Sequence, residues 1–460
     1  MHNPVQSTQR IDSSMSNCAM ISHEEWIDRF SGLQVRLSDE TLKTPSSCHP
    51  STDMKVATTV VSRAMGSDSA TCISAPSAGG RYPYEIYVAS QSNGRHALYK
   101  IDFETRSFRL LKLSSDSLQS PNVSTASLTF AVVERPWKSA SKYGDRGWWY
   151  TQIDAGHALT QLELAARFSN GGHVERLEVF DLAKEFETLH LDKYCRAVFG
   201  GFRMRVSAKE ASIAADFWKI EDWTSIDGSL YFVDSCERLF WDHIRCCYEV
   251  PENRKTFSGL ASEGVMSTTE GFTWEDFILA TKLRESAKKF ERHGLSTSHI
   301  PQLLETTAFS VSEVDHDLCA SVWLDPELIS KPPGGIERRL SSTRLTWQDK
   351  VRMFNGQTHL GHAAGALVFH CKKEVVPHSG PGRMKELLTS SAQIAQHIYL
   401  QAALKDVGIT AIGGFDDRQL TQLLNLSAED TILYAVLFGA ASETSYKPDR
   451  AEASFYHGER

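Results

Sequence analysis

The chain has 460 residues and a formal net charge of −8 at neutral pH, with 41% hydrophobic and 23% charged residues. This length predicts two or three domains, and the hydrophobic content is enough to bury sizeable cores. A mildly acidic chain lacks the broad positive surface that DNA and RNA binding needs. No apolar run reaches the roughly 18 residues of a membrane span. We therefore expect neither nucleic-acid partners nor membrane insertion.

The polar N-terminus predicts a disordered lead-in over residues 1–22 and has no secretory signal. Nine cysteines occur at irregular spacing without a CxxC pair, which favours a reducing, cytoplasmic compartment over a disulfide framework. The adjacent Cys246 and Cys247 show no metal-ligand spacing, so we expect them to be buried structural thiols.

The first half of the chain predicts strands followed by a long helix. Residues 84–90 alternate with period two, residues 93–94 are Asn-Gly, and residues 96–102 resume an extended pattern, which is typical of a strand, turn and strand. Residues 128–133 predict another buried strand. Residues 151–167 carry apolar side chains at helical spacing and predict a long packed helix.

The second half repeats this order, with a strand at residues 366–370, a long helix at residues 384–405 and a buried strand at residues 432–439. The helix sequence GHALTQLELAA, which begins at Gly156, is similar to AQIAQHIYLQAA, which begins at Ala392. A repeat of this length predicts two copies of one α+β unit.

The predicted domains follow from this repeat. We expect unit 1 over residues 23–250, a Gly- and Ser-rich linker over residues 251–272, unit 2 over residues 273–445 and a tail over residues 446–460. Residues 205–250 are expected to be a packing elaboration on unit 1.

The segment APSAGGRY, which begins at Ala75, combines a proline, a hydroxyl group and two consecutive glycines. Such a loop can bring backbone N–H groups close to a flat or anionic ligand. The alternative is an ordinary turn before a strand. Arg81, which ends this pattern, is expected either near the ligand or in solvent.

The segment LRESAKKF, which begins at Leu283, alternates Arg284, Ser286 and Lys288. In an extended stretch these side chains share one face, where two cations and a hydroxyl group could bind a phosphate. The alternative is a solvated, charged start of a helix.

Two further segments carry candidate functional residues. The paired Gly413 and Gly414 follow the second long helix, where they either form a helix C-cap or allow close approach to a ring system. Lys142 and Tyr143 precede the first long helix and could form a base and acid pair if the lysine is partly desolvated. The alternative is an exposed pair without function.

The histidines give no metal motif. His359 and His362, with His370 and Cys371 nearby, lack the glutamate and third ligand of zinc motifs, so no metal is expected. His157 is expected to cap or pack rather than to catalyse.

Taken together, these segments resemble the nitroreductase superfamily, and within it the azoline-oxidase branch that modifies ribosomally made peptides. The resemblance rests on PSAGGRYPYEIYV, KYGDRGWWYTQIDAGH, RESAKKF and QIAQHIYLQAALKDVGITAIGGFDD, which begin at Pro76, Lys142, Arg284 and Gln393. It implies an α+β fold with a central antiparallel sheet flanked by helices, and FMN bound between two subunits. Because this chain carries two units, the resemblance implies an intramolecular pseudo-dimer.

The resemblance also implies roles for particular residues. Lys142 and Tyr143 would be catalytic. The residues that would bind FMN are Pro76, Ser77, Ala78, Gly79, Gly80, Arg284, Ser286, Lys288, Gly413 and Gly414.

The two copies have complementary losses. Unit 1 offers only Arg36 and Ser38, followed by Glu40, in place of the phosphate-binding segment. Unit 2 lacks the Pro-Ser loop and reads Pro-His-Ser-Gly at residues 377–380, where unit 1 has its Lys-Tyr pair. We therefore expect one complete FMN site, built from opposite halves.

The implied function is an FMN-dependent oxidoreductase that oxidises an azoline to an azole on a peptide-derived substrate, in natural-product biosynthesis. Its partners would be that substrate and other enzymes of the same pathway. The alternatives are an NAD(P)H-dependent nitro- or enone-reductase on the same fold, and a non-catalytic peptide-binding protein.

Overall fold

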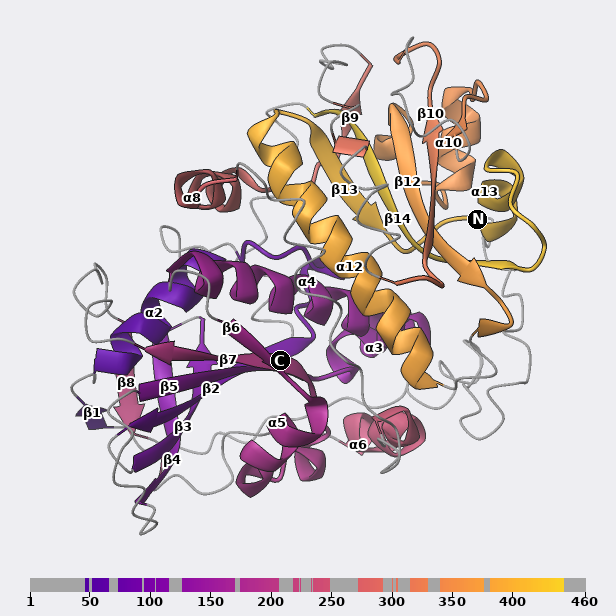
Figure 1. Ribbon diagram of the computed structural model, residues 1–460. Coiled ribbons are helices and arrows are strands. Elements are labelled where there is room, and N and C mark those ends of the chain that lie inside the picture. Colours follow the sequence, from indigo (N-terminus) through magenta and orange to yellow (C-terminus); the bar gives the residue numbers. More distant parts are fainter. Residues whose placement is uncertain are drawn as a thin grey trace.

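The computed structural model (Figure 1) describes residues 46–48, 52–65, 73–92, 95–103, 105–115, 126–169, 174–206, 218–222, 224, 233, 235–248, 272–292, 300, 303–304, 315–329, 340–375 and 381–441. The predicted lead-in, most of the linker, the tail, the Asn-Gly turn, the Arg36–Ser38 segment and residues 377–380 lie outside these ranges. Within them, no helix is both long and apolar enough to cross a membrane.

Unit 1 is built on an eight-stranded sheet of order β1-β8-β4-β3-β2-β5-β7-β6. All neighbouring strands are antiparallel except β4 and β8. The strands are β1 (Ser46–Cys48), β2 (Tyr84–Ser92), β3 (Arg95–Asp102), β4 (Ser107–Ser115), β5 (Ala126–Glu134), β6 (Val174–Leu177), β7 (Ala197–Val206) and β8 (Lys219–Asp222). Its helices are α2 (Thr52–Met65), η1 (Ala78–Gly80), α3 (Trp137–Tyr143), α4 (Arg146–Ser169), α5 (Val179–Glu185), η2 (Glu187–Leu189), η3 (Leu191–Tyr194), α6 (Ser235–Ile244) and η5 (Arg245–Tyr248).

Unit 2 is built on a smaller sheet of order β11-β10-β12-β14-β13, with β9 paired to β14. Among the strands that the structure describes in this unit, β10 and β11 are parallel and the other neighbouring pairs are antiparallel. The strands are β9 (Phe290–Glu291), β10 (Cys319–Leu324), β11 (Leu340–Ser341), β12 (Gly365–Lys372), β13 (Gly408–Ile412) and β14 (Asp430–Ala441). Its helices are α8 (Trp274–Leu283), α10 (Trp347–Met353), η7 (Thr358–Leu360), α12 (Pro381–Leu404) and α13 (Asp417–Leu423).

Each sheet has a four-stranded centre with the same arrangement of strands, which confirms the repeat. In space the order is β2-β5-β7-β6 in unit 1 and β10-β12-β14-β13 in unit 2. Along the chain, each set consists of two strands, the long helix and two more strands. The strands predicted at residues 84–90, 96–102, 128–133, 366–370 and 432–439 are confirmed as β2, β3, β5, β12 and β14.

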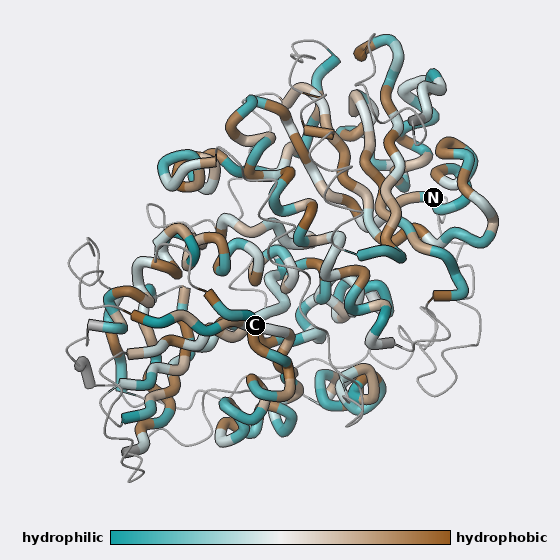
Figure 2. The backbone as a smooth tube through the Cα atoms, viewed as in Figure 1, coloured by the Kyte–Doolittle hydropathy of each residue, from teal (hydrophilic) through white to brown (hydrophobic). Residues whose placement is uncertain are grey.

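The long helices α4 and α12 lie between the two sheets and cross each other (Figure 1). A Cβ atom on Gly156 would lie 2.8 Å from the Cβ atom of Ala392, so the missing side chain allows the helices to approach closely. Both helices are buried along most of their length, as expected for helices packed on several sides. Figure 2 shows apolar stretches in the central strands, whereas both long helices mix apolar and polar residues.

Polar side chains are also buried at this crossing. His157 contacts Oε1 of Gln396 through Nδ1 at 2.8 Å and the hydroxyl oxygen of Tyr434 through Nε2 at 2.9 Å. Gln396 in turn donates to Gln161 at 2.6 Å. Burial lowers the pKa of His157 to about 3, so its ring is neutral and joins the two units through hydrogen bonds.

Helix α8 belongs to unit 2 in the repeat and contacts both α12 and the core of unit 1. Phe277 and Ala280 join the cluster formed by α2, α4 and the first sheet. Thr281 accepts hydrogen bonds from Ser74 and Gln161 at 2.9 Å each. The chain must therefore return from unit 1 to unit 2 directly after α8.

Four expectations need correction. Helix α4 begins at Arg146, before the predicted residue 151, because its first turns are buried partly through polar side chains and lack a clear apolar period. The paired glycines follow β13, so they are not a helix C-cap. Helix α6 packs beyond unit 1, since Phe240 joins a cluster with residues of α12 and the second sheet. Cys247 is a free thiol, whereas Cys246 is disulfide-bonded.

Candidate functional site

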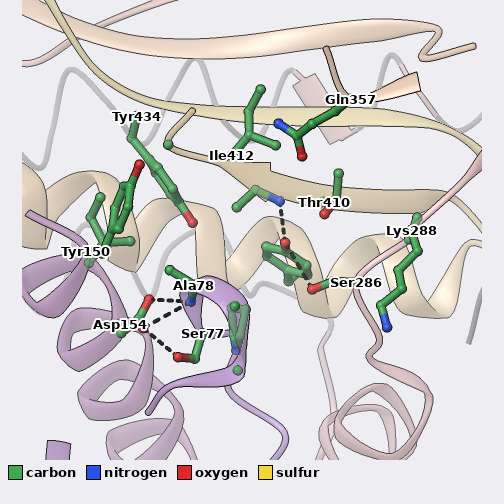
Figure 3. Close-up of a pocket in the computed structure, with 18 of the residues that line it drawn as sticks. Ser77, Ala78, Tyr150, Asp154, Ser286, Lys288, Gln357, Thr410, Ile412 and Tyr434 are labelled. Atoms are coloured by element: carbon green, nitrogen blue, oxygen red, sulfur yellow. Dashed lines mark hydrogen bonds between the residues drawn. The ribbon is translucent and has the colours of Figure 1, made fainter. Parts of the chain in front are cut away.

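A cavity of about 390 Å³ lies between the two units, within the range of small-molecule sites. Nine of the ten residues predicted to bind FMN line it, together with Lys142 and Tyr143. Gly414 is not among the lining residues. Figure 3 shows that α4 and the Pro-Ser loop border one side of the cavity, while β13, Tyr434 and the segment of Ser286 and Lys288 border the other.

The Pro-Ser loop folds around the carboxyl group of Asp154. The Ser77 hydroxyl donates to Oδ2 of Asp154 at 2.6 Å, and the Ala78 amide donates to both carboxyl oxygens at 3.1 and 3.2 Å (Figure 3). Ser77 Oγ also accepts from the Tyr82 amide at 2.8 Å. Gly79 and Gly80 have φ values of 60° and 66°, which explains why glycines occupy these positions.

The segment after α8 carries two cations and a hydroxyl group into the cavity. Arg284 follows α8 in extended conformation, is only 4% exposed and donates to Ser286 Oγ at 3.4 Å. The Ala287 amide donates to the Ile409 carbonyl oxygen at 2.7 Å and so fixes the segment against unit 2. The interpretation as a charged helix start is therefore wrong. Glu285 is exposed and does not line the cavity.

The loop that contains Gly413 is held by residues of unit 1. Arg146 donates to the Gly413 carbonyl oxygen at 2.6 Å and to Asp417 at 3.0 Å. A Cβ atom on Gly413 would overlap the ring of Tyr150, so this position needs a glycine. The Gly414 carbonyl oxygen accepts from Gln357 at 3.4 Å.

Lys142 and Tyr143 end α3 and lie against the Pro-Ser loop. A Cβ atom on Gly79 would overlap the hydroxyl group of Tyr143 and would lie 2.8 Å from Nζ of Lys142. Partial loss of hydration and the positive charge of Arg81 lower the pKa of Lys142. Burial and the Asp154 charge raise the pKa of Tyr143 to about 12. The environment therefore makes Lys142 lose its proton more readily than a free lysine and keeps Tyr143 protonated.

Arg81 itself does not line the cavity. Its Nη2 lies 3.4 Å from Ser141 Oγ at the surface, and its positive charge lowers the pKa of Lys142 and opposes the rise in the pKa of Tyr143.

Sequence reasoning missed several residues of the cavity wall. Asp154 lies within the TQIDAGH segment but has no sequence signal beyond being a carboxylate in an apolar helix. The other lining residues not predicted are Tyr82, Tyr150, Ile153, Ala287, Gln357, His359, Leu360, Tyr399, Thr410, Ala411, Ile412 and Tyr434. Most come from β13, η7 and the long helices, which meet only in the folded chain.

The remaining histidine candidates do not form a metal site. His359 lines the cavity, whereas His370 pairs with Ser321 at 3.0 Å in the second sheet. Among the described residues, one group with metal-ligand spacing occurs, Asp315 to Asp317, and Arg383 already pairs with both of its carboxylates.

One residue of the cavity wall has a charged counterpart in the internal repeat. Tyr399 lines the cavity, and the aligned residue on α4 is Glu163. Glu163 is 4% exposed and pairs with Arg167 at 2.7 Å and with Arg176 at 2.5 Å. Charged side chains thus occupy the place that corresponds to the open cavity wall.

The chain thus has two similar α+β units with a cavity between them. Comparison with known protein families identifies the family to which this fold belongs. The nitroreductase family model matches residues 54–171 and 282–440, which is more than half of the chain. The chain belongs to the nitroreductase family, with two nitroreductase domains in tandem.

A solved structure with a TM-score above 0.5 shows the same fold. A protein from Anabaena variabilis described as a nitroreductase has 18% sequence identity and a TM-score of 0.58, over 88% of this chain and 93% of that chain. A protein from Bacillus subtilis, also described as a nitroreductase, has 14% identity and a TM-score of 0.26 and covers 38% of this chain and 92% of its own. An oxidoreductase containing FMN has 14% identity and a TM-score of 0.26, over 38% of this chain and 82% of that chain. No curated protein matches.

Proposed function

We propose that this protein is an FMN-dependent oxidoreductase that dehydrogenates a peptide-derived substrate, with azoline-to-azole oxidation as the specific reaction. The observation that carries the proposal is the convergence of three groups in one cavity: the cations after α8, the Pro-Ser loop and the Lys142–Tyr143 pair. Unit 1 supplies the loop and the pair, and unit 2 supplies the cations. Membership of the nitroreductase family supports a flavin as the cofactor.

The residues of the cavity fit FMN. Arg284, Ser286 and Lys288 offer two positive charges and a hydroxyl group, which suit a phosphate. The Pro76–Gly80 loop and Gly413 offer backbone without bulky side chains, which suits a flat ring. When bound, FMN would supply the two-electron redox centre.

The roles of the other residues follow from their protonation states. The lowered pKa of Lys142 raises the fraction of neutral amine above that of a free lysine, and this form can take the proton from the substrate carbon. Tyr143, with its pKa raised to about 12, stays protonated and can donate a hydrogen bond to the substrate. Both groups border the cavity, so a substrate placed there is within their reach.

The contacts at Gly79 are also compatible with a second candidate function. Lys142 and Tyr143 pack against the loop, and a purely structural role would explain this packing as well. The protein would then be an NAD(P)H-dependent reductase that needs no base.

Stopped-flow reduction of the bound flavin separates the two functions. General acid–base help contributes typically about 10²–10⁴-fold in rate, so Lys142→Ala should slow substrate-dependent reduction by that factor while flavin stays bound. The limb of the pH–rate profile that belongs to the base should disappear as well. If the variant is reduced as fast as wild type, the pair is structural and the reductase function is favoured.

A further inference from the structure

Asp154 is a buried carboxyl group that the proposed dehydrogenation does not use. It lies about two turns into α4, is 3% exposed, and lines the cavity (Figure 3). Its hydrogen-bond donors are the Ser77 hydroxyl group and the Ala78 amide, and both are uncharged. A carboxylate in this position carries a charge without direct compensation.

The groups around Asp154 add no ion pair. Among the described residues, no hydrogen bond or ion pair joins Asp154 to a cation. The charged and titratable groups that face it or share its cavity are Tyr82 before β2, Tyr84 on β2, Lys142 and Tyr143 on α3, Tyr150 and the neutral His157 on α4, Arg284 and Lys288 after α8, His359 on η7, Tyr399 on α12 and Tyr434 on β14. Burial raises the pKa of Asp154 to about 7, although the bonds from Ser77 and Ala78 oppose this shift.

The loop can stay tethered in both protonation states. The carboxylate accepts the Ser77 and Ala78 hydrogen bonds. The protonated group can still accept from Ala78 through one oxygen, while its own O–H donates to Ser77 Oγ. Protonation therefore removes a negative charge from the cavity wall without releasing the loop.

We propose that Asp154 takes up a proton from solvent when an anionic flavin binds, so that flavin affinity depends on pH through this one side chain. This inference rests on the proposed function. FMN brings negative charge into the cavity and excludes water from it, and both effects disfavour the carboxylate. The contribution of Asp154 to the affinity should therefore be constant below about pH 7 and should fall above it, because Asp154 of the free protein is then ionised and must gain a proton when FMN binds.

The experiment is an FMN titration of wild type and Asp154→Asn between pH 5.5 and 8.5, followed by flavin fluorescence. An asparagine can accept from Ala78 and donate to Ser77, so it imitates the protonated acid. The ratio of the wild-type Kd to the variant Kd cancels the titration of the FMN phosphate. We expect this ratio to rise about threefold or more from pH 6 to pH 8, within the limit of tenfold per pH unit.

The matched control is Asp102→Asn, which removes a carboxylate that pairs with Arg109 and does not line the cavity. It should keep the wild-type pH profile. If wild type and Asp154→Asn both bind FMN and their Kd values change with pH in the same way, the inference is overturned, whereas the proposed function stands. If wild type binds no FMN at any pH, the proposed function fails, and the inference fails with it.

A second measurement covers the case in which Asp154→Asn does not fold. Calorimetric titration of wild type with FMN at pH 7.5, in two buffers of different ionisation enthalpy, counts the protons exchanged. At this pH the phosphate is largely doubly ionised already. Net proton uptake is expected; zero exchange or proton release would overturn the inference.

Discussion

Lys142 and Tyr143 owe their positions to a glycine in the loop opposite them. At Gly79 a side chain would displace the ends of both groups, whereas at Gly80 no protein atom lies within 4 Å of the added Cβ atom. Both glycines have left-handed φ values. An alanine should therefore strain the backbone by a similar amount at both positions, but only at Gly79 would it also collide with other side chains.

Gly79→Ala should slow substrate-dependent flavin reduction by about 10²-fold, the order expected when a catalytic group is displaced by about 1 Å. The Lys142 side chain is flexible and can move aside, whereas the Tyr143 ring packs against Tyr150 and must shift as a unit, so the methyl group should displace both groups from the loop. The rate is measured by stopped flow with the site saturated with flavin.

Gly80→Ala is the matched control for this variant. Its free energy of unfolding should fall by about as much as that of Gly79→Ala, about 1–2 kcal/mol for a residue in the left-handed region. Its rate of flavin reduction should stay closer to that of wild type. Equal rates in the two variants would contradict a catalytic position for the pair.

Arg284 and Lys288 are expected to bind the phosphate. Arg284→Ala should weaken FMN binding by about 1.5–3 kcal/mol, the contribution of a charge-assisted hydrogen bond. Lys288→Ala should act in the same direction. Both affinities follow from fluorescence titration at fixed ionic strength.

Lys289→Ala is the matched control, because Lys289 is 58% exposed, pairs with Glu291 and does not line the cavity. It should leave FMN affinity nearly unchanged. Normal affinity in the Arg284→Ala, Lys288→Ala double variant would contradict the phosphate assignment.

At the scale of elements, the sequence predicted the central strands, the long helices and their repeat, because these depend on local periodicity. It placed the Gly413–Gly414 pair after a helix, since the short strand β13 has few residues to form a pattern. It also missed Asp154 and Tyr150. Their roles depend on where α4 crosses the Pro-Ser loop and the Gly413 loop, which no local pattern encodes.

The crossing of α4 and α12 is the contact that sets the cavity between the units. Gly156→Ala places a methyl group 2.8 Å from the Cβ atom of Ala392. Overpacking of this kind typically costs about 1–3 kcal/mol, partly offset by the better helix propensity of alanine. We expect a lower denaturant midpoint than that of wild type.

Ala392→Gly removes the opposing methyl group and so tests whether contact between residues 156 and 392 causes the loss of stability. The double variant should be more stable than the sum of the two single changes by about 1 kcal/mol, as expected for residues in contact. Simple additivity would show that the two positions do not constrain the crossing.

At the scale of the whole molecule, the two halves carry complementary parts of one site. Unit 1 holds the loop and the Lys142–Tyr143 pair, and the chain brings Arg284 and Lys288 to them by anchoring α8 in unit 1. On the opposite side of the helix crossing, Glu163 and its arginine partners occupy the corresponding position. We therefore expect one working flavin site in each chain.

The number of flavins per chain tests this account most directly. Purified protein is saturated with FMN, freed of excess ligand and denatured, and the released flavin is measured by absorbance against protein concentration. We predict about one FMN per 460-residue chain. A ratio near two would show that the half of the chain with Arg36 and Ser38 also forms a working site, and a ratio near zero would contradict the flavin site altogether.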